Sequence, residues 1–425
     1  MSKSYKQILL ILVITLLFSA CSVKEPVLSQ AKNSDIEVLA TTANDNSFNS
    51  TEVSKDFFNK YFKPWNSTKV SFPKLEAMWG QSYKNKKVYL ENHQLATASW
   101  FDKQIENSNF NDYNILPKKA ITLKNVNIRV LPTNSPMFYD PTQPGEGFPF
   151  DYNQNSSLKI NTPIIVSHLS KDRAWAYIES STVGGWVEIG TIAYVDNDFI
   201  QEFKTSNYFV SVKEKFPIYD PIFREYVKVA TIFPKKNNKY IIAKKDDNQN
   251  AYISYIDLNN DEVESMPLTF NSENRIKIAK QLIDEPYGWG GLLNNRDCSS
   301  FTQDYFATFG KFLHRNSKAQ LSNGKYLDMS NLTNNEKKEF MKNNGVPFST
   351  LVYLKGHIML YIGIKENEPL VLHNMWSVRL KDSNGRKYRH IIGKATVTTL
   401  EPGKGIKDFD EDTNILNKIQ GIVVL

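Results

Sequence analysis

Cys298 is the residue whose surroundings most clearly suggest chemistry. The 425 residues contain two cysteines, Cys21 near the N-terminus and Cys298 in the segment YGWGGLLNNRDCSSF. A cysteine without a disulfide partner is either a small buried hydrophobic side chain or a reactive thiol. Phe301, Tyr305 and Phe309 follow Cys298 at helical spacing, which predicts a helix that begins at the cysteine. Unpaired N–H groups at a helix N-terminus favour an anion, so we expect this position to lower the pKa of the thiol.

Two of the six histidines could activate such a thiol. His357 and His373 fall in the apolar segments GHIMLYIG and LVLHNMW, which predict strands. If these strands are adjacent and antiparallel, His357 can act as the base and His373 can orient it through the second ring nitrogen. Taken singly, each histidine also fits a core residue with a satisfied hydrogen bond, and a lone cysteine can be structural. It is the combination of the three residues that favours a nucleophile with its base. The other histidines show no spacing typical of a zinc site, so we expect no metal and no other cofactor.

The segments around these residues predict an α+β domain. NSENRIKIAKQLIDEP predicts a helix with Ser272 as its N-cap, and Pro286 stops it. After the helix at Cys298, four segments predict strands, namely TLVYLKGHIMLYIGI, LVLHNMW, KATVTTL and GIVVL. Helices followed by an antiparallel sheet are typical of the α+β class.

Upstream, the periodicity changes to that of strands. In NVNIRVLP the apolar residues alternate with Asn127 and Arg129, which places Arg129 on a polar face. Trp175, Tyr177 and Trp186 are expected in the core of a small β-barrel. A second β-rich stretch of similar length follows, and between two strands of the first barrel lies the Pro/Gly-rich loop PTQPGEGFPFD.

The N-terminus has the features of an export signal. Lys3 and Lys6 precede the apolar run ILLILVITLLFSA, which is too short to span a membrane comfortably and ends at Cys21. The ending FSAC resembles a bacterial lipoprotein signal, in which the cysteine carries the lipid; Phe18 stands where that pattern usually has Leu. Plain secretion and a retained membrane anchor are the alternatives. Ser22 after the cysteine resembles the outer-membrane sorting default, so the resemblance implies a lipid-anchored protein of the cell envelope, on the outer membrane facing the periplasm.

Three segments together resemble the NlpC family of bacterial cell-wall cysteine peptidases. They are YGWGG…RDCSSF, KGHIMLYIG and LVLHNMW, in the order and spacing of that family. NVNIRVLPT, GEGFPFD, SKDRAWAYIES and GGWV resemble the bacterial SH3-like domain of a multidomain subgroup, which also has a second SH3-like domain and an N-terminal clip-like domain. A barrel packs against the active site in some of these relatives, so the resemblance implies that GEGFPFD reaches the catalytic cleft and narrows it. The resemblance implies a papain-like C-terminal domain and this division: signal peptide 1–20, flexible tether 21–50, clip-like and mostly helical or irregular domain 51–117, SH3-like domains 118–197 and 198–266, papain-like domain 267–425.

The family's site residues carry over by position. Cys298 is then the nucleophile, His357 the general base and His373 the orienting residue. Tyr287 resembles a tyrosine whose hydroxyl helps to bind the oxyanion, and Asp297 and Ser299 flank the nucleophile where the substrate lies. In relatives that need a free amine at the start of the substrate, the acid before the cysteine helps to bind that amine.

The resemblance implies hydrolysis of peptidoglycan stem peptides, between γ-D-glutamate and a diamino acid. Two other readings remain open, namely an inactive peptidoglycan-binding lipoprotein, or an amidase or acyltransferase on the same fold.

The composition, with 41% hydrophobic and 23% charged residues, is that of a folded globular protein. The net charge of +7 favours acidic partners, but no nucleic-acid motif is present, so we expect a monomer whose partners are peptidoglycan stems and a membrane, and no nucleic acid.

Overall fold

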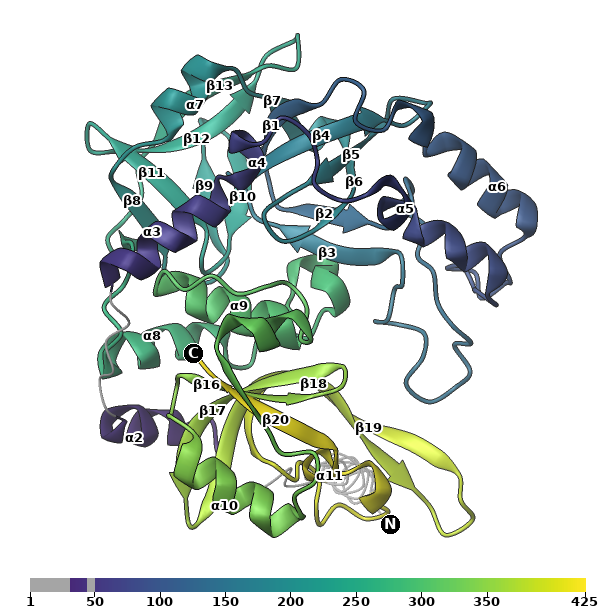
Figure 1. The fold of residues 1–425 in the computed structure, drawn as a ribbon, viewed down its shortest axis with the longest axis vertical. Coiled ribbons are helices and arrows are strands. Elements are labelled where there is room, and N and C mark those ends of the chain that lie inside the picture. Colours follow the sequence, from purple (N-terminus) through teal and green to yellow (C-terminus); the bar gives the residue numbers. More distant parts are fainter. Residues whose placement is uncertain (1–30, 44–49) are drawn as a thin grey trace, which may run out of the picture.

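The protein is described from a computed structural model that covers residues 31–43 and 50–425. The described residues form four β-sheets of seven, two, five and six strands, and two helices of the C-terminal part lie between its sheet and the upstream sheets (Figure 1). The expectation of a mixed α+β protein with helical, SH3-like and C-terminal catalytic parts is confirmed, whereas the exact domain boundaries stay predictions. The predicted signal peptide, with Cys21, lies outside the described residues. Among the helices of the described ranges, none is long and apolar enough to cross a membrane.

The N-terminal region is helical and irregular, as predicted. Its elements are α2 (Asp35–Thr42), α3 (Ser50–Tyr61), α4 (Lys63–Asn66), α5 (Lys74–Ala77), η1 (Trp79–Asn85), α6 (Ala98–Asn107) and η2 (Phe110–Asp112). The prediction of a flexible tether over residues 21–50 is wrong for α2. Ile36, Leu39 and Ala40 are buried on one face of this helix, and Leu39 lies against Gly363 of the C-terminal sheet. Lys365 adds an ion pair to Asp35 at 3.0 Å.

The first barrel is a seven-stranded antiparallel sheet with the strand order β3-β2-β6-β5-β4-β1-β7. Its elements are β1 (Lys118–Thr122), β2 (Val126–Arg129), β3 (Gln154–Leu158), β4 (Pro163–Leu169), β5 (Trp175–Glu179), β6 (Gly184–Glu188), η3 (Ile189–Thr191) and β7 (Ile192–Tyr194). Its interior is filled by aliphatic side chains such as Ile128, Val166 and Ile178. Trp175, Tyr177 and Trp186 are buried, but on the opposite face, where they pack with Ala77 and Phe110 of the N-terminal region. The expectation that they form the barrel core is therefore wrong: they form its contact with the helical region.

The alternating pattern of its strand predicts Arg129 on a polar face, but its side chain is buried. Nη1 of this side chain donates to Asp151 Oδ2 and to Gln154 Oε1, both at 2.8 Å. A buried guanidinium is tolerated only when it is paired in this way. The polar residue in the strand pattern thus marks a buried ion pair that fixes the base of the 130–153 loop.

The second β unit contains a five-stranded sheet and a separate hairpin. The sheet has the order β13-β12-β11-β8-β14, and the hairpin pairs β9 with β10. The elements are α7 (Asn197–Phe203), β8 (Tyr208–Ser211), β9 (Phe216–Tyr219), β10 (Phe223–Val227), β11 (Ile232–Lys236), β12 (Lys239–Lys245), β13 (Ala251–Ile256) and β14 (Val263–Ser265).

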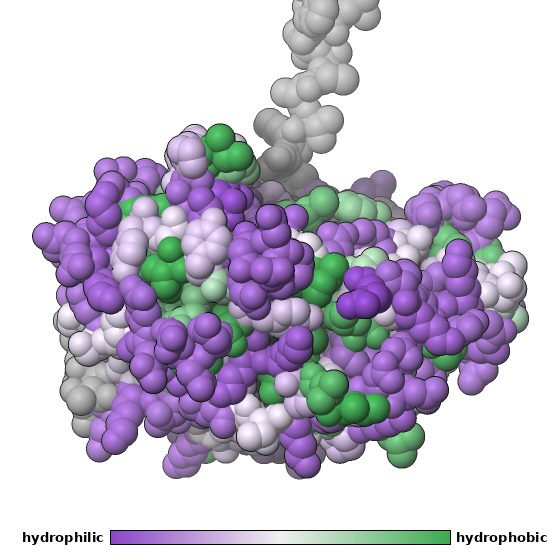
Figure 2. Space-filling view, turned by 90° about the horizontal axis from the view of Figure 1, so that it is seen from above, coloured by the Kyte–Doolittle hydropathy of each residue, from purple (hydrophilic) through white to green (hydrophobic). Residues whose placement is uncertain are grey.

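Seen from above, the surface of the molecule is mostly hydrophilic with separate small hydrophobic patches (Figure 2).

The C-terminal domain packs helices against a six-stranded antiparallel sheet of order β15-β20-β16-β17-β18-β19. Its elements are α8 (Ser272–Leu282), η4 (Trp289–Asn294), α9 (Cys298–Thr308), η5 (Ala319–Asn323), β15 (Lys325–Asp328), α10 (Asn334–Asn344), β16 (Thr350–Leu354), β17 (His357–Lys365), β18 (Glu368–Lys381), β19 (Lys387–Thr399), η6 (Glu411–Thr413), α11 (Ile415–Lys418) and β20 (Ile419–Val424). The predicted strands and the helix beginning at Cys298 are confirmed. The N-cap of α8 is Asn271 rather than Ser272, because the Asn271 side chain accepts from the N–H of Asn274.

Candidate active site

Cys298 is the first residue of α9, and the preceding acid fixes the start of this helix. The carboxylate of Asp297 accepts from the N–H of Ser300 at 2.8 Å, while Ser300 Oγ accepts from the N–H of Asp297 at 2.9 Å. This reciprocal pair is a capping box, which satisfies two otherwise unpaired donors and stabilises the first turn. Helix α9 packs on β17 and β18, the strands that carry the two histidines.

The thiol of Cys298 is not activated in the way its helix position suggests. Burial, followed by the negative charge of Asp297, raises the pKa of Cys298 to about 12. Hydrogen bonds from the N–H groups of Ile358 and Ser299, with the charge of Arg315, act in the opposite direction. The expected fall in pKa is therefore wrong, because burial and then the carboxylate that caps the helix outweigh the N–H groups that favour a thiolate. A thiol with a raised pKa becomes a nucleophile only after a base removes its proton.

His357 begins β17, and Ile358, which donates to the Cys298 sulfur, is its neighbour in sequence. His357 Nε2 lies 2.7 Å from His373 Nδ1, and His373 Nε2 lies 3.0 Å from Thr398 Oγ1. The predicted pairing of the two histidines on adjacent antiparallel strands is thus observed. Burial lowers the pKa of His357 to about 4, and burial and then His357 lower that of His373 well below its ordinary value. Both rings are neutral near pH 7.

The proton positions on both rings follow from Thr398. Its hydroxyl donates its one hydrogen to the carbonyl of Thr399 at 2.7 Å, so it can only accept from His373 Nε2–H. His373 Nδ1 then carries a lone pair and accepts from His357 Nε2–H. The remaining nitrogen of His357, Nδ1, is left unprotonated as a base. Thr398, which the sequence analysis did not single out, thereby sets the tautomer of the base.

Arg315 is a second residue that the sequence analysis missed. Its guanidinium holds the carboxylate of Asp297 with two hydrogen bonds of 3.1 and 2.8 Å, and Nη1 also donates to Ser299 Oγ at 2.9 Å. Nε donates to Ser156 Oγ in the first barrel at 2.7 Å. Burial opposes ionisation, but Arg315 and the Ser300 N–H keep the pKa of Asp297 below its ordinary value. Arg315 lines the cleft, whereas His314, its neighbour in sequence, does not.

Asp297 and Ser299 lie where the sequence analysis put them, beside the nucleophile. The oxygens of Asp297 accept from Arg315, Ser299, Ser300 and the N–H of Gly290. These contacts give both residues a role in positioning, and their direct contact with a substrate stays a prediction. Tyr287 lines the cleft with Cys298. Burial, then Cys298 and Asp297, raise the pKa of Tyr287 well above its ordinary value, so its hydroxyl remains a donor.

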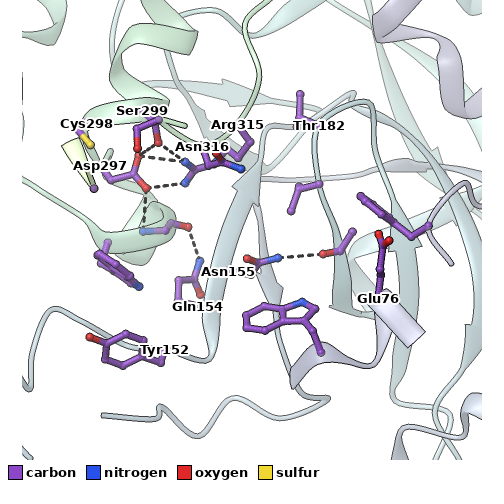
Figure 3. A pocket seen from close by; sticks show the side chains of 18 of the residues that line it. Glu76, Tyr152, Gln154, Asn155, Thr182, Asp297, Cys298, Ser299, Arg315 and Asn316 are labelled. Atoms are coloured by element: carbon purple, nitrogen blue, oxygen red, sulfur yellow. Dashed lines mark hydrogen bonds and ion pairs between the residues drawn. The ribbon is translucent and has the colours of Figure 1, made fainter. Parts of the chain in front are cut away.

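A cleft of about 540 Å³ opens at Cys298. Its walls come from the N-terminal region, the first barrel and the C-terminal domain (Figure 3). Cys298, Asp297, Ser299 and Arg315 lie together at one end, and Glu76 of α5 lies at the other. A second pocket of about 310 Å³ is lined by His357 and shares with the cleft only Tyr287, Trp289 and Gly356. Cys298 thus lines the cleft and His357 lines the adjoining pocket.

The barrel reaches this site through two contacts. The first is the turn of η4, where Gly290 (φ +58°) and Gly291 (φ +89°) let the backbone lie close to β3. A Cβ added at Gly290 would lie 2.4 Å from Gln154 O, and one added at Gly291 would lie 2.1 Å from Ser157 Oγ. The second is the 130–153 loop, whose Phe150 ring lies 6.2 Å from that of Trp376. Phe150 lines the second pocket, so the loop reaches the site as expected, whereas its narrowing of the cleft stays a prediction. Within residues 31–43 and 50–425, no cluster of three or more His, Cys, Asp or Glu side chains could hold a metal ion.

Three regions of the chain match known families. Residues 284–393 match the NlpC/P60 family, residues 136–188 the SH3 domain of SH3b1 type, and residues 10–113 the N-terminal NLPC_P60 stabilising domain. A solved NlpC/P60 endopeptidase from Photobacterium damselae subsp. piscicida superposes with a TM-score of 0.85 at 25% identity, over 94% of this chain and 98% of that one. A probable endopeptidase of Corynebacterium glutamicum (strain R) is 32% identical over 83 residues, 19% of this chain and 39% of that protein, so the match spans well under half of that relative. The chain carries an NlpC/P60 domain with the papain-like fold, preceded by an SH3-type and a stabilising domain.

Proposed function

We propose that this NlpC/P60 domain makes the chain a cysteine endopeptidase that hydrolyses peptidoglycan stem peptides between γ-D-glutamate and a diamino acid. The observation that carries the proposal is the hydrogen-bonded chain His357, His373 and Thr398, which leaves an unprotonated base next to the strand residue that contacts the Cys298 sulfur. The match to the NlpC/P60 family and the names of the relatives support a peptidase.

The chemistry follows from the proton positions. His357 Nδ1 takes the proton of Cys298 as Sγ attacks the carbonyl carbon, so the thiolate forms only as it reacts. Charge then develops on the carbonyl oxygen, where the N–H groups at the start of α9 and the Tyr287 hydroxyl can donate. When the tetrahedral intermediate collapses, His357 gives its proton to the leaving amine. The acyl thioester that remains on Cys298 is released by water, with His357 again as the base.

The cleft and the second pocket then hold different halves of the substrate. The leaving amine must lie by His357, which protonates it, so the leaving half enters the pocket of about 310 Å³. The acyl half lies in the larger cleft beside Cys298. At the Cys298 end of that cleft Arg315 and Asp297 pair with each other, so the unpaired charge of its lining is that of Glu76 at the other end (Figure 3). This carboxylate supports a short acyl half with a cation at its far end. L-Ala-γ-D-Glu with a free amine has this pattern of charge.

Digestion of purified stem peptides tests the proposal. We expect the wild-type chain to release L-Ala-γ-D-Glu, identified by mass spectrometry, and Cys298→Ala to release none. A stem acetylated at L-Ala should be a poor substrate, because it loses the charge that faces Glu76. Stems that bind but stay intact would instead favour an inactive peptidoglycan-binding protein, and release of a different acyl half would favour an amidase or acyltransferase.

We also propose that the chain is exported and held by lipid on Cys21 at the outer membrane, facing the periplasm. The support is the basic and apolar run that ends in FSAC. Labelling cells with a tagged fatty acid should mark the wild-type chain and leave Cys21→Ser unmarked. Equal labelling of both chains, or of neither, would contradict the anchor.

A further inference from the structure

The pocket that takes the leaving half is strongly basic. The charged side chains that line it, the catalytic His357 apart, are Lys355, Arg379, Arg389 and Lys418, and its lining contains no aspartate or glutamate. Arg379 and Arg389 come from β18 and β19, Lys355 from the turn before β17, and Lys418 from α11 (Figure 1). We call this space the basic pocket. Trp289 and Trp376 also line it, and Trp289 is shared with the cleft at Cys298.

Two of these cations oppose each other without a compensating charge. Arg379 and Arg389 are direct partners in the antiparallel ladder of β18 and β19. Like charges placed directly opposite across two strands destabilise a sheet. In the part of the chain that the structure describes, neither guanidinium forms an ion pair, and Arg389 reaches only two neutral oxygens, Ser377 Oγ at 3.4 Å and Pro144 O at 3.5 Å.

The neighbouring acids do not neutralise the pocket. Burial and then Arg379 lower the pKa of Arg389, and Glu146 offsets only part of this effect. Burial and then Arg379 likewise lower the pKa of Lys418, against the opposing charge of Asp410. A stable fold gains nothing from such an arrangement, whereas an anion bound in the pocket would relieve it.

We infer that the basic pocket binds a carboxylate of the leaving half, and that the enzyme therefore prefers stems whose diamino acid has a second carboxyl group, such as diaminopimelate, over lysine stems. The inference rests on the proposed function. A lysine side chain ends in an ammonium group alone, which the four cations repel. A diaminopimelate side chain ends in a carboxylate as well, which two guanidinium groups side by side can hold with charge-assisted hydrogen bonds.

Four synthetic substrates test the inference and identify the carboxylate. Each begins with L-Ala-γ-D-Glu, continues with diaminopimelate or lysine, and ends in D-Ala as a free acid or as an amide. We expect kcat/KM of the full chain to be at least about tenfold higher for diaminopimelate than for lysine, with the amide changing this ratio little. Equal values for the two diamino acids would overturn the inference, whether or not the terminal amide lowers both. Cleavage of none of the four would overturn the proposed function itself.

Charge-removing variants assign the preference to the pocket. Arg379→Gln and Arg389→Gln should each lower kcat/KM for the diaminopimelate stem about tenfold and change that for the lysine stem little. Arg386→Gln is the matched control, because Arg386 is an exposed cation of the same hairpin and does not line the pocket. Arg379→Gln should not lower the melting temperature, since it removes a repulsion, and this confirms that the variant is folded. A diaminopimelate preference that survives both variants, or that Arg386→Gln also removes, would contradict the assignment.

Discussion

Thr398 decides which nitrogen of His357 can act as a base, although it contacts neither Cys298 nor His357. Its single hydrogen is committed to Thr399 O, and the direction of every hydrogen bond in the chain follows from this. A valine of the same shape would leave His373 Nε2 without a partner and both tautomers accessible. The hydroxyl of Thr398 is thus a positioning group for the base.

Thr398→Val should therefore lower kcat and leave KM nearly unchanged. We expect a loss of about tenfold, the value of one hydrogen bond of ordinary strength. Thr398 lines neither the cleft nor the basic pocket, so binding should persist. Thr398→Ser should restore activity, and Thr396→Val, on the same strand, is the control. An unchanged kcat in Thr398→Val would contradict the proton assignment.

The pH dependence of kcat/KM tests the state of the histidine. His357 must be neutral to accept the proton of Cys298, and its pKa is lowered to about 4. The neutral form therefore persists as the pH falls to about 4 and is lost only below it. We expect the acid limb of the pH profile near 4, whereas an unperturbed histidine would place it near about 6.5. An acid limb at the unperturbed value would show that burial does not set the pKa of this base.

At the level of single residues, the candidate nucleophile and both histidines could be predicted from the sequence. Their residue types and local patterns are visible in short segments, and the structure brings His357 and His373 together as predicted. Arg315 and Thr398 were not visible in this way. Their roles depend on partners in other elements, and an arginine or a threonine is common at positions with no such role.

The turn of η4 is the element that joins the catalytic helix to the barrel. Its two glycines let the backbone lie directly on β3, and Gln154 Nε2 donates to Gly290 O at 3.1 Å. Both glycines are visible in the segment YGWGG, but only the structure shows which strand they approach. The residue type of a turn position shows that its backbone is free to adopt a positive φ. It does not show which neighbour requires that conformation, because this neighbour lies more than a hundred residues away in the chain.

Gly291→Ala should destabilise the protein more than Gly385→Ala does. Both glycines have a positive φ, +89° and +81°, so each substitution has a similar backbone cost of about 1–2 kcal/mol. At Gly291 the new Cβ would also meet Ser157 Oγ at 2.1 Å, whereas at Gly385 nothing lies within 4 Å. Urea denaturation measures the difference in the free energy of unfolding. Equal losses would show that the close approach to the barrel contributes nothing.

Across the whole molecule, a buried network of charges fixes the barrels to the catalytic helix. Arg296, two residues before Cys298, holds Glu214 of the second β unit with hydrogen bonds of 2.8 and 2.9 Å. Its Nε donates to Asp304 in α9 at 2.7 Å, and Lys159 of the first barrel pairs with the same carboxylate. The first barrel, the second β unit and the C-terminal domain are therefore joined by this network next to the nucleophile.

Glu214→Gln should unfold far more easily than the wild type. Removing one partner of a buried ion pair leaves an uncompensated charge and costs about 3–5 kcal/mol. Lys213→Gln is the control, because its ion pair with Asp261 is exposed and should contribute little. Urea denaturation measures both variants. A loss no larger in Glu214→Gln than in Lys213→Gln would contradict a structural role for the network.

The arrangement of the parts was the least predictable feature. Strand periodicity revealed both β units and the C-terminal sheet, because each pattern is local. The packing of Trp175, Tyr177 and Trp186 on the helical region, and of α2 on the C-terminal sheet, joins segments far apart in the chain. An apolar residue in a strand shows that it is buried, but not which partner covers it.

The central claim is that Cys298 takes the acyl half of a stem peptide, with the leaving half in the basic pocket. Its most direct test is intact-protein mass spectrometry of the chain quenched in acid during turnover of a diaminopimelate stem. The account predicts an adduct with the mass of L-Ala-γ-D-Glu, mapped by peptide digestion to Cys298 and absent from Cys298→Ala. An adduct that contains the diamino acid, or one attached to any other residue, would contradict it.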